Sequence, residues 1–299
     1  MDKNINGNIV SQVLYDTLNT YLQTQQKIPS VVDISIGNDF GGLMYSKMKQ
    51  KKISSTTPIN FQSVHFDSID CENLLTYINE LNNDDNITGI MLQLPLPNYL
   101  KNYERLILDT INPNKDVDGL TTLQSGLLFT GQDALVPCTA LGIETLLRSY
   151  GVLLEGKQIA IINRSNIVGK PLVPLMLRNN ATPIVCHSKT NNLSDITKKC
   201  DIVIAALNKQ QYITNNYIRD NAVVIDVGVH KNSDGKTVGD VNYLDVVDKA
   251  CLITPPVGAV GPMTICMLAY NATKTLYGAD VNHLLDTGIT KAKALVKKR

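Results

Sequence analysis

The sequence of 299 residues carries almost no net charge and lacks a signal-peptide pattern. Its formal net charge is +1, which gives no electrostatic reason to expect nucleic acid or a membrane surface as a partner. The N-terminal residues MDKNINGN are polar and lack the apolar core of a signal peptide. We therefore expect a cytoplasmic protein.

The six cysteines and four histidines form no disulfide or metal-binding pattern. No Cys-x-x-Cys pair occurs, and several cysteines lie in apolar stretches, so we expect reduced, buried thiols. The histidines have no metal-ligand spacing, and no metal site is predicted. A long uncharged stretch, Cys251 to Ala272, contains three prolines and two glycines, which favour a loop and a helix start over a membrane span.

Only the last glycine of the usual dinucleotide fingerprint is present, as Gly169 in KQIAIINRSNIVGKP at 157–171. Ile159–Ile162 has the composition of a buried strand, and a polar turn and a helical pattern follow. This order is typical of the phosphate-binding half of a Rossmann unit, although an ordinary crossover would look the same. Asn163 replaces the first glycine, and Asn tolerates the positive φ expected there.

No acidic residue follows the second expected strand, 183–186, where an NAD enzyme keeps one for the ribose 2′-hydroxyl. The sequence there is His187-Ser188-Lys189-Thr190. With Arg164, these side chains suit a 2′-phosphate, which binds through charge-assisted hydrogen bonds and which an acid would repel. The sequence therefore predicts NADP in preference to NAD.

Alternating strand and helix patterns predict an α/β fold with two α/β domains. We expect a first domain from residues 1–138 plus 265–299, to which the C-terminal helices return. The second, 139–264, is expected to be a Rossmann-like NADP-binding domain with a parallel sheet. Further strands are expected at 31–36, 61–66, 88–92, 201–206 and 222–228, and helices at 8–23, 44–52, 70–81, 100–111, 120–129, 141–150, 263–276 and 281–298. The cleft between two such domains is the default site.

Tyr45 and Lys49 lie four residues apart on an expected helix and so share a face. Lys47, Lys51 and Lys52 are close by, and repulsion between like charges eases the loss of a proton, which suits proton transfer. The alternative is a solvated basic face. We favour it for those three lysines, whereas for Tyr45 and Lys49 both interpretations stay open.

Two further groups follow expected elements. Gln93 begins QLPLP at 93–97 and lies at the C-terminal end of a strand, where open α/β sheets bind ligands; the prolines make a rigid turn that permits a cis bond. Asp116 and Asp118 lie near the expected domain junction. Such a pair most often forms loop hydrogen bonds, but a carboxylate can also hold the N–H groups of a heterocycle.

Taken in order, these motifs closely resemble the bacterial FolD family of bifunctional methylenetetrahydrofolate dehydrogenase/methenyltetrahydrofolate cyclohydrolases. The resemblance covers essentially the whole chain, and it rests on order and spacing more than on one motif. The motifs are Tyr45-x-x-x-Lys49, QLPLP at 93–97, KDVDG at 115–119, PCT at 137–139, RSNIVGKP at 164–171, VIDVG at 224–228, VGD at 238–240 and VGPMT at 260–264.

The resemblance implies a role for each motif. Lys49 would be the cyclohydrolase general acid/base, Gln93 its hydrogen-bonded partner, Asp118 the anchor of the pterin, and Tyr45 a stacking partner of the substrate. Gly261, Pro262 and Thr264 would lie near the pterin and the nicotinamide. The residues implied for NADP binding are Asn163, Arg164, Ser165, Ile167, Gly169, His187, Ser188 and Val229. The substrates would be tetrahydrofolate derivatives, and the assembly a homodimer formed through the NADP-binding domains.

The sequence departs from the family at three places, and two other classes of protein are alternatives. Gly41-Gly42 replaces Ala-Ser, Asn163 replaces a glycine, and TPPVGA at 254–259 replaces Thr-Pro-Val-Pro-Gly-Gly; none removes a side chain that the chemistry needs. A short-chain dehydrogenase also uses Tyr-x-x-x-Lys, but its nucleotide fingerprint precedes the Tyr. A non-catalytic folate- or nucleotide-binding protein is the other alternative, which a turnover assay decides.

Overall fold

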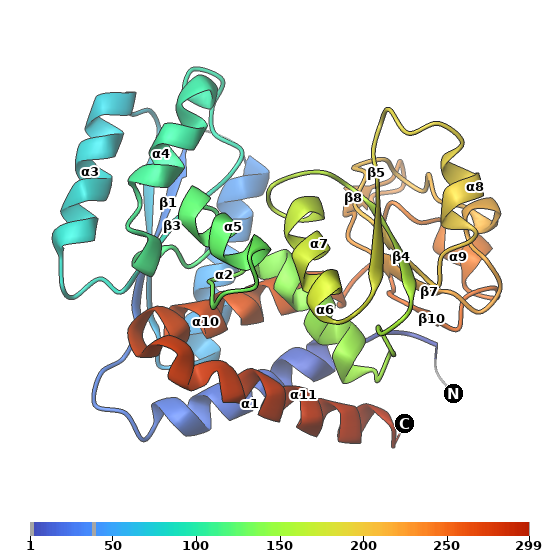
Figure 1. Ribbon diagram of the computed structural model, residues 1–299. Coiled ribbons are helices and arrows are strands. Elements are labelled where there is room, and N and C mark those ends of the chain that lie inside the picture. Colours follow the sequence, from blue (N-terminus) through green and yellow to red (C-terminus); the bar gives the residue numbers. More distant parts are fainter. Residues whose placement is uncertain (1–2, 38–39, 299) are drawn as a thin grey trace. The chain divides into compact units, whose positions relative to one another are not determined.

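The computed structural model describes residues 3–37 and 40–298, and its contacts divide the chain into two compact units (Figure 1). The three-stranded unit consists of Tyr15–Val136 and Ile265–Asp286. The five-stranded unit consists of Met1–Leu14, Pro137–Thr264 and Thr287–Arg299. The division expected from the sequence assigned residues at both chain ends to the first domain, whereas here they group with the five-stranded unit. The division expected from the sequence stays a prediction.

The three-stranded unit is built on a short parallel sheet in the order β2-β1-β3. Its central strand is buried along almost its whole length. The strands are β1 (Ser30–Ile36), β2 (Asn60–Phe66) and β3 (Gly89–Leu92). The other elements are α2 (Phe40–Thr56), α3 (Cys71–Asn83), η1 (Lys101–Tyr103), α4 (Glu104–Thr110), η2 (Pro113–Lys115), α5 (Thr122–Phe129) and η4 (Gly278–Val281).

The five-stranded unit has a fully parallel sheet in the order β10-β7-β6-β4-β5. The middle strands are buried because they pack on both faces, as parallel strands joined by helices do. The strands are β4 (Gln158–Ile162), β5 (Thr182–Cys186), β6 (Ile202–Ala205), β7 (Val223–Asp226) and β10 (Leu252–Ile253), with an antiparallel pair β8 (His230–Lys231) and β9 (Thr237–Val238). The helices are α6 (Cys138–Ser149), α7 (Gly169–Arg178), α8 (Leu193–Thr197), η3 (Asn215–Tyr217) and α9 (Tyr243–Val246).

Three long helices lie near the ends of the chain. They are α1 (Gly7–Leu22) after the N-terminus, and α10 (Val260–Tyr277) and α11 (Asn282–Val296) before the C-terminus. Helices α1 and α11 run side by side in Figure 1, where a Cβ added at Gly288 would lie 2.4 Å from Leu14 Cδ2. Within the described part of the chain, no helix is long and apolar enough to cross a membrane. The uncharged stretch 251–272 forms β10, a loop and the first part of α10, as its prolines predict.

Every expected strand is present, and the differences concern short or irregular elements. The helix expected at 100–111 is a 3₁₀ turn followed by α4, because Tyr103 N–H and Glu104 N–H bond to the carbonyls of Leu100 and Lys101, three residues back. The hairpin β8–β9 and helices α8 and α9 have two to five residues each, too few for periodicity to predict.

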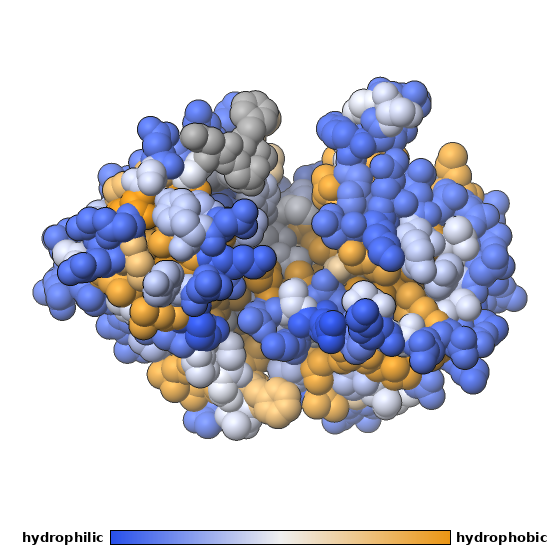
Figure 2. Space-filling view, turned by 90° about the horizontal axis from the view of Figure 1, so that it is seen from above, coloured by the Kyte–Doolittle hydropathy of each residue, from blue (hydrophilic) through white to orange (hydrophobic). Residues whose placement is uncertain are grey.

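The surface mixes polar and apolar side chains (Figure 2). Hydrophilic residues cover most of the face shown, with smaller apolar areas between them. In the five-stranded unit the large apolar side chains that remain exposed are Leu153, Leu177, Val185, Tyr212, Val229, Leu244, Val257 and Leu295. Single exposed apolar residues are ordinary. Val185 differs from the others because it lies on β5, an edge strand of the five-stranded sheet.

Candidate functional sites

Lys49 is held inside the three-stranded unit although it is a charged residue on a helix rich in lysine. Its side chain is 1% exposed, because α2 packs on β1 and β2 and the position faces the sheet. Its Nζ donates hydrogen bonds to Gln93 Oε1 at 2.6 Å and to Met91 Sδ at 3.4 Å. It also lies 3.3 Å from Asp33 Oδ2. A buried ammonium needs such partners, since an unpaired one is very costly.

Asp33 is the residue of this site that sequence reasoning missed. It lies in the middle of β1 and is fully buried. Ser46 Oγ donates a 2.6 Å hydrogen bond to the same oxygen that faces Lys49, and Ser46 Oγ lies 3.3 Å from Ser63 Oγ. The available signal was an acid inside the otherwise apolar, β-branched run Val31–Ile34, because a buried carboxylate requires a partner.

Gln93 lies directly after β3, at the end of the sheet that the sequence predicted for it. Its backbone N–H bonds to the Ile34 carbonyl at 2.8 Å, which continues the pairing of β3 with β1. Its side-chain Nε2 donates to the Leu94 carbonyl at 3.1 Å, so that Oε1 points toward Lys49. The Leu94-Pro95 peptide bond is cis. The turn thus fixes an acceptor against the buried ammonium.

The neighbouring lysines differ from Lys49 in their surroundings. Lys47 and Lys51 are exposed, as expected for a solvated basic face. Lys52 is half-buried with its Nζ 5.3 Å from the centroid of the Tyr15 ring. Lys49 Nζ lies 5.3 Å from the centroid of the half-buried Tyr45 ring. The electrostatic partner of Lys49 is therefore a carboxylate, and crowding by the other lysines does not account for its environment.

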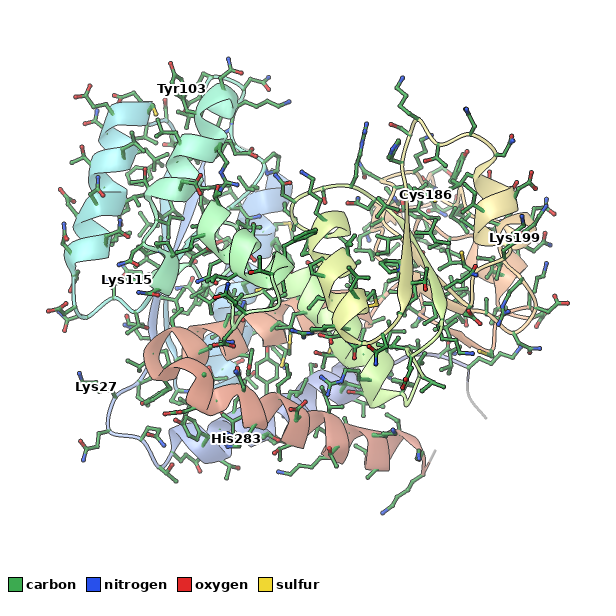
Figure 3. The ribbon with its side chains drawn as sticks, viewed as in Figure 1. Lys27, Tyr103, Lys115, Cys186, Lys199 and His283 are labelled. Atoms are coloured by element: carbon green, nitrogen blue, oxygen red, sulfur yellow. The ribbon has the colours of Figure 1, made fainter. Side chains whose placement is uncertain are left out.

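The loop 115–119 is fixed by contacts on three sides. Lys115 Nζ donates to the carbonyls of Leu81, Asn82 and Asp84 at the end of α3 (Figure 3), where a cation also suits the helix dipole. Val117 N–H bonds to the Ile90 carbonyl of β3. From α10, Asn271 Nδ2 donates to the carbonyls of Val117 and Val136, and this residue was not singled out from the sequence.

The two carboxylates of this loop differ in burial. Asp116 is 2% exposed and accepts a 2.7 Å hydrogen bond from Thr121 N–H, and burial raises its pKa. Asp116 therefore has the loop-stabilising role that such pairs most often have. Asp118 is half-buried on the same loop, and Gly119 follows it with a φ of 66°. The pair Gly41-Gly42 is one of the departures from the family, and the surroundings of Gly41 lie outside what the structure describes.

The turn after β4 in the five-stranded unit has a different basis from the one expected. Asn163 is not among the residues with positive φ, so that expectation is wrong. Its side chain organises the turn instead: Oδ1 accepts from Ser165 N–H at 2.7 Å and Gly169 N–H at 3.1 Å, and Nδ2 donates to the Ala206 carbonyl of the segment after β6. An Asn side chain bonding to backbone two residues on is a common turn device.

Gly169 is required at the start of α7 by space. A Cβ added there would lie 2.2 Å from the Asn163 carbonyl oxygen and 2.7 Å from Arg164 N, both inside contact distance. This is the close approach of helix and strand for which the third fingerprint glycine is used. The helix N-terminus is thereby brought against the polar turn 163–166.

A pocket of about 430 Å³ lies at the C-terminal ends of β4, β5 and β6. It contains five of the eight residues expected to bind a dinucleotide, namely Asn163, Arg164, Ser165, His187 and Ser188. Ile167, Gly169 and Val229 are not among its lining residues. The remaining lining residues are Ile162, Thr190, Leu193, Ala206, Leu207, Lys209 and Tyr212. Those from 206 onward follow β6, and the rule that ligands bind at carboxyl ends of strands could have found them.

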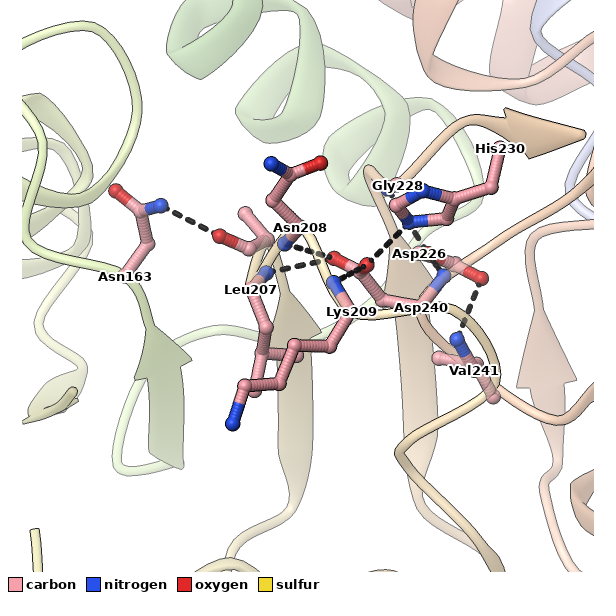
Figure 4. A network of polar contacts seen from close by, with 10 residues as sticks. Asn163, Leu207, Asn208, Lys209, Asp226, Gly228, His230, Asp240 and Val241 are labelled. Carbon is pink, nitrogen blue, oxygen red and sulfur yellow. Dashed lines mark hydrogen bonds and ion pairs between the residues drawn. The ribbon is translucent and has the colours of Figure 1, made fainter. Parts of the chain in front are cut away.

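The loop 207–209 of this pocket is held by a buried carboxylate (Figure 4). Asp240, fully buried, accepts hydrogen bonds from the backbone N–H groups of Leu207, Asn208 and Lys209, at 2.6, 3.1 and 2.8 Å. Its Oδ1 also lies 2.8 Å from His230 Nε2. Successive N–H groups around one carboxylate form a nest, which orders the Lys209 backbone.

Asp226 lies beside Asp240 and completes this network. It accepts from the backbone N–H groups of Gly228, Asp240 and Val241, each at 2.9 Å. Burial, and secondarily the Asp240 charge, raises the pKa of Asp226 to about 6. The motifs at 224–228 and 238–240 therefore act together to hold the pocket loop from behind.

The remaining predicted residues lie at the start of α10. Thr264 Oγ1 donates to Thr139 Oγ1 at 3.2 Å. Pro262 is half-buried and Gly261 is exposed. Nothing lies within 4 Å of a Cβ added at Gly261. The preceding loop, where the sequence departs from the family, bends at Gly258 with a φ of 85°. The Gly258 carbonyl accepts from Gly7 N–H at 2.8 Å, so α1 fixes the backbone path of this loop.

The geometry defines a class of protein. A parallel sheet with a glycine-requiring turn and a cationic pocket at its strand ends is a dinucleotide-binding unit of the Rossmann type, and the other unit contains a buried lysine, Lys49. Two family models match successive parts of the chain. The catalytic domain of tetrahydrofolate dehydrogenase/cyclohydrolase matches residues 3–118, and its NAD(P)-binding domain matches residues 137–279.

Individual relatives agree over nearly the full length. A protein named bifunctional protein FolD from Lachnoclostridium phytofermentans is 42% identical over 280 residues, 93% of this chain and 96% of that protein. The solved FolD dehydrogenase/cyclohydrolase of Campylobacter jejuni has a TM-score of 0.86 at 36% identity, over 91% of this chain and 98% of that one. The Trypanosoma brucei dehydrogenase-cyclohydrolase, complexed with NADP and an inhibitor, has a TM-score of 0.85 at 29% identity, over 92% and 97%.

The chain belongs to the FolD family of bifunctional methylenetetrahydrofolate dehydrogenases/methenyltetrahydrofolate cyclohydrolases. Its two reactions are the oxidation of 5,10-methylenetetrahydrofolate with a nicotinamide dinucleotide and the hydrolysis of the 5,10-methenyl product to 10-formyltetrahydrofolate.

Proposed function

We propose that Lys49 is the general acid/base of the hydrolysis and that Gln93 fixes its position. The observation that carries this proposal is the fully buried Lys49 side chain, whose Nζ lies 2.6 Å from Gln93 Oε1. A lysine held in one place, away from bulk water, can take a proton from a water molecule and return it to a leaving nitrogen. Both steps need a base of fixed position more than a strong one.

The proposed course of hydrolysis begins with a neutral Lys49. Lys49 Nζ takes a proton as the oxygen of a water molecule bonds to the cationic methenyl carbon. The same proton then goes to N5 as the bond from that carbon to N5 breaks. The hydroxyl group from the water loses its remaining proton to solvent and becomes the carbonyl of the formyl group on N10. The positive charge of the folate thus passes to Lys49 and finally leaves with the released proton.

We infer that the folate is oriented by residues around this lysine. Asp118 would hold the pterin ring through two hydrogen bonds, since a carboxylate matches an N–H pair of a heterocycle. Tyr45, with its ring beside Lys49, would stack on the pterin or its aminobenzoyl neighbour. Gly261, Pro262 and Thr264 would contact the substrate or the nicotinamide. Each of these assignments follows the family motif residue by residue.

We also propose NADP, in preference to NAD, as the cofactor. The pocket of about 430 Å³ contains Arg164, Ser188 and Lys209, and a cationic, hydroxyl-lined pocket suits a phosphate group. The steric requirement for glycine at 169 fits a diphosphate approaching the helix N-terminus. When bound, the nicotinamide ring accepts the hydride. The part of the chain's own residues in that step is to bind and orient both partners, because N5 of the folate stabilises the developing cation.

The remaining proposals concern partners and location. We expect a cytoplasmic homodimer formed through the NADP-binding domains, as the family resemblance implies. The substrates are tetrahydrofolate derivatives, and no nucleic acid or membrane is expected as a partner because the net charge is only +1.

Substituting Lys49→Met tests the proposed mechanism. Methionine keeps much of the length of lysine but cannot carry a proton, so hydrolysis should fall by about 10²–10⁴-fold, the contribution of a positioned base. Dehydrogenase activity should persist, because hydride transfer needs no base on the protein. The measurement follows reduced cofactor and the near-ultraviolet absorbance of methenyltetrahydrofolate, which should accumulate.

The matched controls are Lys47→Met and Lys51→Met, both at exposed positions of the same helix. These variants should hydrolyse the methenyl substrate at the native rate. Native hydrolysis by Lys49→Met, after subtraction of the spontaneous reaction, would exclude Lys49 as the acid/base.

A further inference from the structure

The starting observation is that both members of the Lys49–Asp33 pair are buried, at 1% and 0% exposure. A buried ion pair is weak evidence for stability, because removing two charges from water costs about as much as their attraction returns. Apolar side chains of similar volume would fill this space at least as well. The pair therefore calls for an explanation in the chemistry of Lys49.

The contacts of the ammonium account for its three hydrogens. They face Gln93 Oε1, Met91 Sδ and Asp33 Oδ2. Only the last of these partners carries charge, and it belongs to β1, the central strand of the sheet. The carboxylate is itself fixed by the 2.6 Å hydrogen bond from Ser46 Oγ. Its other oxygen, Oδ1, is buried and accepts no hydrogen bond from the described residues.

We propose that Asp33 is a positioning residue for the hydrolysis, acting through Lys49. When Lys49 takes the proton of the attacking water, an ammonium forms 3.3 Å from Asp33 Oδ2. The fixed negative charge stabilises that ammonium at the moment it appears and keeps it facing the site. No proton passes to Asp33: water loses its proton to Lys49 Nζ, the carbon–oxygen bond forms, and the folate cation is neutralised. This inference rests on the proposed role of Lys49.

The charge of Asp33 should act on the hydrolysis and not on the hydride transfer. It stabilises the ammonium that forms on Lys49 as water loses its proton, whereas hydride transfer forms no ammonium on the protein. Of the titratable groups that face Lys49, Asp33 comes from β1 and Tyr45 from α2. The facing groups from β3 and the segment after it, Met91 and Gln93, are uncharged.

The test is Asp33→Asn, which keeps the shape and removes the charge. The maximal hydrolysis rate should fall by about 10- to 100-fold, less than on loss of the base itself, with little change in KM for the methenyl substrate. Dehydrogenase activity should stay within about threefold of native, since it uses no protein base. A packing role alone would not change the ratio of the two activities.

Asp67→Asn is the control, because Asp67 is an exposed acid, 89% accessible, in the same unit. It should leave both activities unchanged. If Asp33→Asn does not fold, Asp33→Glu replaces it: a folded variant, in which one more methylene moves the charge, should lose hydrolysis and keep dehydrogenase activity. Native hydrolysis, or equal losses of both activities, would contradict the proposal.

The inference and the proposed function fail in different ways. Asp33→Asn with native hydrolysis, or with equal losses of both activities, overturns the role of Asp33 while a hydrolysis-deficient Lys49→Met still supports Lys49. Native hydrolysis by Lys49→Met overturns the proposed mechanism, and the inference about Asp33 with it.

Discussion

Arg164 and Ser188 line the same pocket from the ends of two neighbouring strands, β4 and β5. Arg164 is the side chain there best suited to a 2′-phosphate, because its guanidinium gives several fixed donors. Arg164→Ala should weaken NADP binding by about 1.5–3 kcal/mol, the size of a lost charged hydrogen bond, and leave NAD binding nearly unchanged. Fluorescence titration with the two reduced cofactors measures both constants.

The control is Arg219→Ala, an arginine of the same unit that pairs with Asp201 and does not line the pocket. It should leave the two dissociation constants as they are. Equal losses for NADP and NAD in Arg164→Ala would remove the assignment of the 2′-phosphate site.

Residue types and spacing singled out Lys49 and Gln93, whose side chains are hydrogen-bonded in the structure, but they could not indicate the partners that come from other strands. Lys49 and Gln93 were found because a helical spacing and a strand end are local features. Asp33 was missed because its pairing with Lys49 depends on how α2 packs on β1. The expected positive φ at Asn163 was wrong for a similar reason: its side chain satisfies the turn through Gly169 N–H and the Ala206 carbonyl, the second of which is distant in sequence.

At the scale of elements, Gly169 shows how one residue type sets the contact between a strand and a helix. Gly169→Ala places a Cβ 2.2 Å from the Asn163 carbonyl oxygen, so backbone atoms of β4 or α7 must move. We expect a loss of about 1–3 kcal/mol in the free energy of unfolding, the usual cost of overpacking, together with weaker cofactor binding. Urea unfolding and cofactor titration of the same sample measure the two effects.

Gly126→Ala is the opposite case. Gly126 is an exposed residue inside α5 with nothing within 4 Å of an added Cβ. Because alanine favours helix over glycine by up to about 1 kcal/mol, this variant should be slightly more stable than the native chain and should bind the cofactor equally well. A Gly169→Ala variant as stable as the native chain would show that α7 can shift at no cost.

The elements themselves were predictable where their patterns are long, and their edges were not. The buried strands β4, β6 and β7 were expected within two residues of their observed bounds, because apolar runs of this kind are distinctive. The 3₁₀ turn before α4, the hairpin β8–β9 and the network of Asp226 and Asp240 depend on hydrogen bonds between distant segments. Periodicity contains no information about such bonds.

At the scale of the whole molecule, the edge of the five-stranded sheet bears on the proposed dimer. Strand β5 is last in the order of strands, and its Val185 is 42% exposed. Thr182 N–H bonds to the Lys157 carbonyl on the β4 side. The backbone N–H groups that face away from β4 are therefore those of positions 183 and 185, and Pro183 has no N–H. An edge with so few donors resists continuation of the sheet by another strand. A second copy would therefore be held there by side chains.

We expect the native chain to sediment at the mass of two chains at micromolar concentration, and Val185→Glu to shift it toward one chain, because a charge in the middle of an apolar contact must be desolvated. The control is Leu244→Glu on α9 of the same unit, where Leu244 is 83% exposed and lies on a different element; it should leave the dimer intact. Sedimentation velocity of the three proteins, with NADP titrations on each, separates assembly from cofactor binding. A native chain with the mass of one protomer would contradict the dimer itself, and a dimeric Val185→Glu would place its interface away from β5.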